Sequence, residues 1–344
     1  MVLEILVIGG SKFIGKHLVF TLAKKNDVNI TVINRGKSNP NLTYPDNVTL
    51  VKADRRKPEE LKKAIGDKIY DYVFDIVLIY GNDAKELLKI LEGKVRNRFI
   101  YVSSASVYEV SGDPNLIESI PIFEDDPIGP TTDDQHWYLK EKRLCEQYLL
   151  DAYKNQDFPV SIVRPSFVYG PDNYIYREAY FFDRLTNDEP ILLPANASHA
   201  ITDFSFVEDV VDICIRCMDN EKALGQAYNA ASGEMVSPDD ITKIVARIMD
   251  KEPQILYYTR DDLKAVDWPE NTMPPYPFND DGKFGLSIIK AINDLGFTPK
   301  YRLKDGFKLA SEWFNKNQSH LKFQKPDAES LKQLTEHLSS KNSD

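Results

Sequence analysis

The first 165 residues repeat one pattern, in which a short apolar run is followed by a stretch with helical spacing. The apolar runs lie at 3–8, 28–33, 48–51, 72–78, 98–102 and 160–163, and the helical stretches at 13–25, 58–65, 83–93 and 137–154. Runs that are apolar throughout are typical of strands buried on both faces, and helices between them indicate parallel connections. The pattern predicts an α/β fold with a doubly wound parallel sheet of the Rossmann type.

A glycine-containing loop joins the first strand to the first helix. It reads Gly9-Gly10-Ser11-Lys12-Phe13-Ile14-Gly15. A loop that holds a dinucleotide pyrophosphate needs a tight turn and a close approach of helix to strand, which Gly9 and Gly15 can supply. Lys12 stands where a third glycine is usual, and it either points outward or places its ammonium over the phosphates. We therefore expect cofactor contacts from Gly9, Ser11, Lys12, Phe13, Ile14 and Gly15.

The second strand ends in Asn34, Arg35, Gly36 and Lys37. Enzymes selective for NAD usually carry Asp or Glu here for the ribose hydroxyls. Without that carboxylate, and with Arg35 available to pair with a 2′-phosphate, the sequence favours NADP over NAD. A solvated loop is the alternative. We expect further cofactor contacts near the carboxyl ends of the other strands, from Asp54 and Arg55 at the adenine and from Val77, Pro165 and Phe167.

Tyr138 and Lys142 are spaced i, i+4, so they share one face of the helix that follows the fifth strand. A lysine ammonium favours the phenolate of a neighbouring tyrosine, which can then remove a proton from a substrate hydroxyl. Ser104 ends the fifth strand and can orient the substrate oxygen. The three residues form the predicted catalytic set.

These features resemble the extended short-chain dehydrogenase/reductases, within the NAD-dependent epimerase/dehydratase family, over about residues 3–315. The resemblance implies that Ser104, Tyr138 and Lys142 have the family's catalytic roles and that a homodimer can form through 83–93 and 137–154. The most similar branch includes chloroplast stem-loop RNA-binding proteins and bacterial relatives. Besides the glycine loop and Tyr138-x-x-x-Lys142, the motifs are Tyr101–Tyr108, Val163–Pro171, Asp203–Val210 and Leu295–Pro299.

Departures from the family pattern bear on the reaction. The 4,6-dehydratases carry Asp-Glu where this chain has Ala105 and Ser106, which argues against water loss and against decarboxylation. Phe167 and Thr202 replace the Asn and Arg that contact the sugar nucleotide in the family, so a diphosphate would need other cations, for which Arg177 and Arg184 are candidates. The acidic interval 109–136 is predicted to be a surface loop near the pocket mouth.

The domain division follows from a change in composition after about residue 165, where Tyr, Phe, Pro and Asn become frequent. We predict a dinucleotide-binding domain at 1–165 with a returning segment at about 204–232. A smaller C-terminal substrate-binding cap is predicted over 166–203 and 233–317. The charged segment 318–344 is expected to form an exposed helix or to be partly disordered.

The charge and cysteine usage limit the function classes. The formal net charge is −10, which argues against nucleic-acid binding as the main activity. Cys214 and Cys217 lie in an apolar run that reads as a buried helix, and no histidine spacing suggests a metal site. No apolar run approaches membrane-spanning length and no signal-like segment is present, so a cytoplasmic enzyme is expected.

The leading hypothesis is an NAD(P)-dependent epimerase or oxidoreductase acting on a sugar nucleotide or a related small molecule. Two alternatives stay open: an NADPH-dependent carbonyl reductase, and an RNA-binding or scaffold protein that retains the fold.

Overall fold

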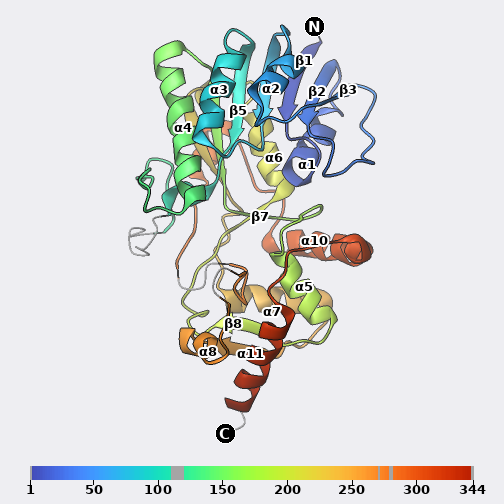
Figure 1. The fold of residues 1–344 in the computed structure, drawn as a ribbon, viewed down its shortest axis with the longest axis vertical. Coiled ribbons are helices and arrows are strands. Elements are labelled where there is room, and N and C mark those ends of the chain that lie inside the picture. The colour runs from blue at the N-terminus through green and yellow to red at the C-terminus, as the bar shows by residue number, and fades with distance from the viewer. Residues whose placement is uncertain (1, 110–119, 270–271, 279–281, 342–344) are drawn as a thin grey trace. The chain divides into compact units, whose positions relative to one another are not determined.

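The computed structural model describes residues 2–109, 120–269, 272–278 and 282–341 (Figure 1). The chain divides into two compact units. Unit 1 comprises the described residues of Met1–Val168, Ser205–Gly233 and Leu286–Lys300. Unit 2 comprises those of Tyr169–Phe204, Glu234–Gly285 and Tyr301–Asp344. Residues 286–300, which the sequence grouped with the cap, therefore belong to unit 1.

Unit 1 contains a seven-stranded sheet in which every pairing is parallel. The strand order is β10-β6-β5-β4-β1-β2-β3, so the chain winds outward from β1 in both directions. This doubly wound α/β fold confirms the predicted fold class. The strands are β1 (Leu3–Ile8), β2 (Val28–Asn34), β3 (Val48–Lys52), β4 (Tyr70–Asp75), β5 (Val95–Val102), β6 (Val160–Pro165) and β10 (Gln226–Ala230).

Helices cover both faces of this sheet, and alternate side chains of β1 show why. Ile5 and Val7 join one apolar core, whereas Leu6 and Ile8 join the other. The first core is completed by α1 (Phe13–Leu22), α6 (Val207–Arg216) and α9 (Ile289–Leu295). The second is completed by α2 (Pro58–Ile65), α3 (Gly81–Leu91) and α4 (Trp137–Gln156). Burial on both faces is the reason why the strand sequences are apolar throughout.

Two local features of unit 1 bear on the sequence predictions. Strand β4 ends at Asp75, three residues before the predicted end, because the Asp75 carboxylate accepts a hydrogen bond from the Val77 amide and turns the chain. Cys214 and Cys217 are buried free thiols at the end of α6, which confirms the buried-helix interpretation. The 3-10 helix η1 (Ala105–Tyr108) follows β5, and η2 (Glu221–Ala223) precedes β10.

Short strands β7 (Phe167–Tyr169) and β9 (Phe204–Phe206) lie where the chain passes between the units. Unit 2 has a parallel two-stranded sheet of β8 (Ile191–Pro194) and β11 (Ile255–Tyr258). Its core is rich in aromatic rings, most of them packed edge-on or tilted, and Tyr169 stacks on Phe307 with centroids 4.5 Å apart. Its helices are α5 (Glu178–Thr186), α7 (Pro238–Met249), α8 (Arg260–Ala265), α10 (Leu303–Asn317) and α11 (Ala328–Lys341), with the 3-10 helix η3 (Gln318–His320) after α10.

The C-terminal segment forms a helix, which was one of the two predicted alternatives, but one side of that helix is buried rather than exposed. Helix α11 buries Leu334 and Leu338. On the same helix, His337 and Lys341 pair with the buried carboxylate of Asp262 in α8, at 2.9 and 2.7 Å. Nothing in the sequence indicated this packing, because the carboxylate that pairs with His337 and Lys341 is distant in the chain. Among the described residues, no helix has the length and apolarity to cross a membrane.

Candidate functional site

The loop between β1 and α1 has space only for glycine at three positions. Gly9 has φ +99°, and a Cβ there would lie 2.5 Å from a methyl group of Val77. A Cβ on Gly10 would lie 2.7 Å from Val19, and one on Gly15 would lie 2.0 Å from the Gly9 carbonyl oxygen. Helix α1 therefore starts in direct contact with the end of β1. This cradle fits the backbone approach that a dinucleotide pyrophosphate requires.

The other predicted residues of this loop lie at the start of α1. Lys12 is exposed at the N-cap position, Ser11 and Ile14 are half-buried, and Phe13 is buried with φ +41°. A positive φ is unusual for phenylalanine, so the apolar core holds this ring in place against a backbone cost.

The end of β2 carries a small hydrogen-bond network. The Asn34 side chain accepts from the Gly36 amide at 2.7 Å and donates to the Tyr44 hydroxyl at 3.4 Å. That hydroxyl donates to the Gly10 carbonyl at 3.1 Å, which links β2 to the glycine loop. Arg35 and Lys37 are exposed beside it. Sequence reasoning missed Tyr44, since nothing local marks a residue whose partners lie ten and 34 positions away.

Lys142 is almost completely buried in α4, and its ammonium donates to the carbonyl oxygens of Leu78 at 2.9 Å and Val102 at 3.1 Å. Leu78 lies just after β4, and Val102 is the last residue of β5. The ammonium lies 6.0 Å from the centre of the Tyr138 ring and 4.8 Å from that of Tyr101. Burial lowers the pKa of Lys142 to about 8, and the Cys145 thiol and Asp75 carboxylate oppose that shift. The i, i+4 pair predicted from the sequence is thus brought together at the carboxyl edge of the sheet.

Ser104 lies two residues beyond the end of β5, at the N-cap of η1. Its hydroxyl oxygen accepts from the Ser106 amide at 3.2 Å and from the Ser106 hydroxyl at 2.9 Å. Tyr138 is half-buried in the first turn of α4, with its ring edge against Trp137. Because Lys142 bonds to Val102, helix α4 is anchored to the strand that leads into Ser104.

A network of buried polar side chains forms hydrogen bonds to residues of η1. The Arg164 guanidinium pairs with the Glu146 carboxylate at 2.7 Å and donates to the Tyr108 hydroxyl at 2.7 Å. That hydroxyl donates to Asn229 of β10 at 2.9 Å, and Arg143 donates to the Val107 carbonyl at 2.9 Å. Buried charges of this kind are tolerated because each is paired or hydrogen-bonded. The sequence motifs contained these residues, but their partners could not be inferred from spacing.

The remaining predicted cofactor residues of unit 1 lie at or just beyond the carboxyl ends of β3, β4 and β6. Val77 is exposed above Gly9, Pro165 ends β6 in the core of the sheet, and Phe167 begins β7 half-buried. Asp54 accepts from the Arg56 amide at 3.1 Å. Arg55 was expected at the adenine, but its guanidinium is bound by two carboxylates, as described below.

The two arginines of unit 2 that were candidates for a diphosphate lie at opposite ends of α5. The Arg184 side chain is 5% exposed, donates to the Pro190 carbonyl and lies 3.4 Å from the Glu189 carboxylate. Arg184 is therefore held in place by its own helix end, which counts against the expected contact with a diphosphate. Arg177 is half-buried at the N-cap of α5.

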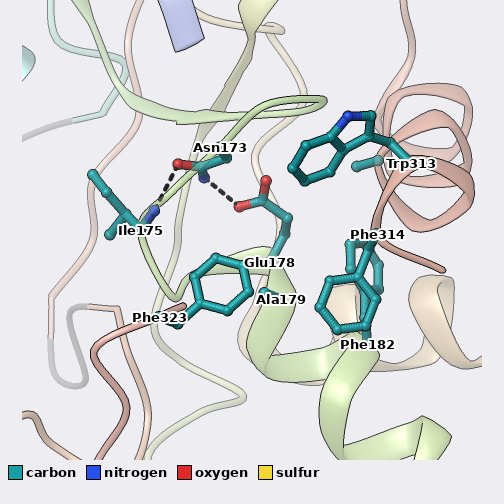
Figure 2. A pocket seen from close by; sticks show the side chains of 9 residues that line it. Asn173, Ile175, Glu178, Ala179, Phe182, Trp313, Phe314 and Phe323 are labelled. Carbon is teal, nitrogen blue, oxygen red and sulfur yellow. Dashed lines mark hydrogen bonds between the residues drawn. The ribbon is translucent and has the colours of Figure 1, made fainter. Parts of the chain in front are cut away.

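A small cavity in unit 2 is lined by aromatic rings and one buried carboxyl group (Figure 2). Its volume of about 10 Å³ suits a single water molecule rather than a substrate. Glu178 accepts from the Gly170 amide at 3.0 Å and from the Asn173 side chain at 2.7 Å. Burial raises the pKa of Glu178 to about 7. The carboxyl group thereby fixes the loop that follows β7.

Residues 5–231 of the chain match the sequence model of the NAD-dependent epimerase/dehydratase family. The chain belongs to this family. The match covers the glycine loop, the Tyr138–Lys142 pair and the returning strand β10. Membership in this enzyme family confirms the resemblance stated from the sequence motifs.

The individual proteins that resemble this chain are each less than 30% identical to it. The chain is 29% identical to a chloroplast stem-loop binding protein of 41 kDa from Arabidopsis thaliana, over 88% of this chain and 77% of the relative. Its fold is similar to that of an epimerase from Methanothermobacter thermautotrophicus, with TM-score 0.75, 23% identity, and coverage of 92% and 94%. It is also similar to a UDP-glucose 4-epimerase from Thermotoga maritima, solved with UDP-glucose, with TM-score 0.73, 22% identity, and coverage of 92% and 99%.

The two positions at which the resemblance expected a carboxyl pair in a 4,6-dehydratase, Ala105 and Ser106, lie in η1. Ala105 is buried, and Ser106 donates its hydroxyl hydrogen to Ser104. Neither side chain carries a carboxyl group that could act as the acid or base of water loss.

Proposed function

We propose that this chain is an NAD(P)-dependent epimerase or oxidoreductase that acts on a hydroxyl or keto group of a sugar nucleotide or a related small molecule. The observation that carries the proposal is the buried Lys142 ammonium, held by the carbonyls of Leu78 and Val102 beside the Tyr138 ring. The glycine cradle at residues 9–15 supports it, because it provides a pyrophosphate site at the same edge of the sheet.

In this proposal each residue has a defined role. Tyr138 takes the proton of the substrate hydroxyl as general base, and the Lys142 charge favours the phenolate that does so. The two carbonyls use two of the three N–H donors of Lys142, and the third would bind a ribose hydroxyl. Ser104 would donate a hydrogen bond to the substrate oxygen. A bound nicotinamide supplies the acceptance and return of a hydride.

The test is turnover of UDP- and GDP-hexoses, followed by NMR detection of inversion at C4. Tyr138→Phe keeps the ring and removes the hydroxyl, so it should reduce the rate by roughly 10²–10⁴-fold. Tyr148→Phe, on the same helix, is the matched control and should retain the rate. Absence of turnover on every hexose by a folded wild-type protein would refute epimerisation.

A carbonyl reductase that uses NADPH is the second candidate, favoured by the end of β2. Asn34 occupies the expected ribose position, and its carbonyl oxygen is already used by the Gly36 amide. The exposed Arg35 would pair with a 2′-phosphate. Mass spectrometry of the protein as purified separates the candidates, because an epimerase recycles and retains its cofactor. A protein that carries no cofactor and consumes NADPH would favour the reductase.

An RNA-binding role is the third candidate, raised by the name of the Arabidopsis relative. The formal net charge of −10 opposes it, since phosphate backbones are bound chiefly through cationic side chains. A gel-shift titration with structured RNA at several salt concentrations is the test. Tight binding that weakens steeply with salt would support this role over the enzymatic one.

A further inference from the structure

A buried charge network lies beyond the carboxyl ends of β3 and β4. The Arg55 guanidinium contacts the Asp75 carboxylate at 2.9 Å and the Asp83 carboxylate at 3.1 Å. The Asp75 side chain is fully buried, whereas those of Arg55 and Asp83 are 10% and 23% exposed. A fully buried carboxylate is costly without a cation, and Arg55 meets that requirement for Asp75. The pair is therefore an anchored unit rather than a surface ion pair.

Asp75 connects Arg55 to the glycine cradle through the turn that follows β4. Its second oxygen accepts from the Val77 amide at 3.0 Å, which fixes the turn that ends β4. The Val77 methyl groups then lie where a side chain on Gly9 would be, 2.5 Å from the Cβ position. Arg55, Asp75, Val77 and Gly9 thus form a continuous line of contacts from the end of β3 to the pyrophosphate loop.

The same turn also reaches the candidate catalytic lysine. Leu78, one residue after Val77, offers the carbonyl that accepts from Lys142 at 2.9 Å. The Asp75 carboxylate also acts on Lys142 through space, where it opposes the effect of burial on the lysine's pKa. A change in the orientation of Asp75 would consequently disturb both the cofactor loop and the lysine.

We propose that Arg55 is a positioning residue, which holds Asp75 so that the turn at 75–78 supports the glycine cradle and Lys142. In this role Arg55 acts through Asp75 rather than by binding the adenine, because its two terminal nitrogens are held by the carboxylates of Asp75 and Asp83. The inference rests on the proposed function only in taking the cradle at 9–15 to bind NAD(H) or NADP(H). It assigns Arg55 to affinity for the whole dinucleotide rather than to the choice between the two cofactors.

Titration calorimetry with NADH and NADPH tests this assignment on the full chain. Arg55→Met should weaken binding of both cofactors by a similar factor of roughly ten, a magnitude usual for coupled neighbouring residues. Arg55→Lys keeps a cation and should recover part of the loss. Arg35→Met provides the contrast, since a residue at the 2′-phosphate weakens NADPH alone. Lys57→Met removes an exposed cation from the same segment and should change neither constant.

The double variant Arg55→Met with Asp75→Asn covers the case in which Arg55→Met alone does not fold. The amide introduced by Asp75→Asn carries no charge to neutralise and still offers an oxygen to the Val77 amide, so the double variant should bind more tightly than Arg55→Met. The fitted stoichiometry separates unfolded protein, which lowers the number of sites, from a loosened loop, which raises the Kd.

Each outcome decides between the roles. A loss confined to NADPH, unchanged constants in a folded Arg55→Met, or a double variant that binds no more tightly than Arg55→Met overturns the positioning role while the proposed function stands. A folded wild-type protein that binds neither cofactor overturns both. Equal losses of affinity for NADH and NADPH in Arg55→Met, together with tighter binding by the double variant, support the positioning role.

Discussion

A Cβ atom on Gly15 would lie 2.0 Å from the carbonyl oxygen of Gly9, so α1 meets the end of β1 with no space for a side chain. Because this oxygen belongs to the backbone, it cannot rotate away as the end of a side chain could. Gly15→Ala should therefore lower the free energy of unfolding by about 1–3 kcal/mol and weaken binding of NADH and NADPH together. Urea unfolding and cofactor titration measure the two effects. Gly282→Ala, which meets nothing within 4 Å, should be neutral, and equal behaviour of the two variants would contradict the packing argument.

Lys142 should make stability depend on pH in the alkaline range. Burial lowers its pKa to about 8 in the folded protein, from 10.5 in the unfolded chain. Between these values the unfolded chain binds more protons, so the free energy of unfolding rises with pH. Relative to Lys142→Met, the wild type should gain about 3 kcal/mol from pH 8 to 10.5. Urea unfolding of both proteins across this window gives the difference, and a flat difference would show that the ammonium is not desolvated.

Glu178 should make the free energy of unfolding fall as pH rises, in a lower pH range than the one in which Lys142 acts. Its folded pKa of about 7 lies above the 4.5 of the unfolded chain, because burial penalises the carboxylate. Its contribution is complete below pH 4.5 and is lost as pH rises through 7. Relative to Glu178→Gln, the wild type should lose about 3 kcal/mol of unfolding free energy between these values. Denaturation at about pH 5 and about pH 7.5 measures it, with the exposed Glu312→Gln as a control that should show no such trend.

Helix α11 should contribute to the stability of unit 2. Leu334 is completely buried in it, and truncation of a buried leucine to alanine leaves a cavity. Leu334→Ala should cost about 2–5 kcal/mol and speed amide hydrogen exchange throughout residues 328–341. Gln333→Ala, on the exposed side of the same helix, should leave both unchanged. Equal exchange rates in the two variants would restore the view of 318–344 as an unpacked tail.

The order of strands and helices over residues 3–165 could be predicted because each of these elements carries its own periodicity. The Tyr138–Lys142 spacing and the glycine loop are likewise local patterns, set by helix geometry and by the conformational needs of a turn. Strand β10 joins the sheet beside β6 although a long stretch of chain separates them, so no local pattern could show their register. The acidic interval 109–136 is only partly within the described residues, and its predicted role at a pocket mouth stays a prediction.

The sequence by itself determined a parallel sheet, a glycine cradle and a tyrosine–lysine pair, since these follow from short-range sterics and from apolar periodicity. Only the tertiary structure decided which atoms the charged groups meet. Arg55 pairs with the Asp75 carboxylate, and Lys142 donates to the carbonyls of Leu78 and Val102. Buried ionic groups take whatever partner the fold brings within hydrogen-bond reach, and that proximity arises from contacts distant in the chain.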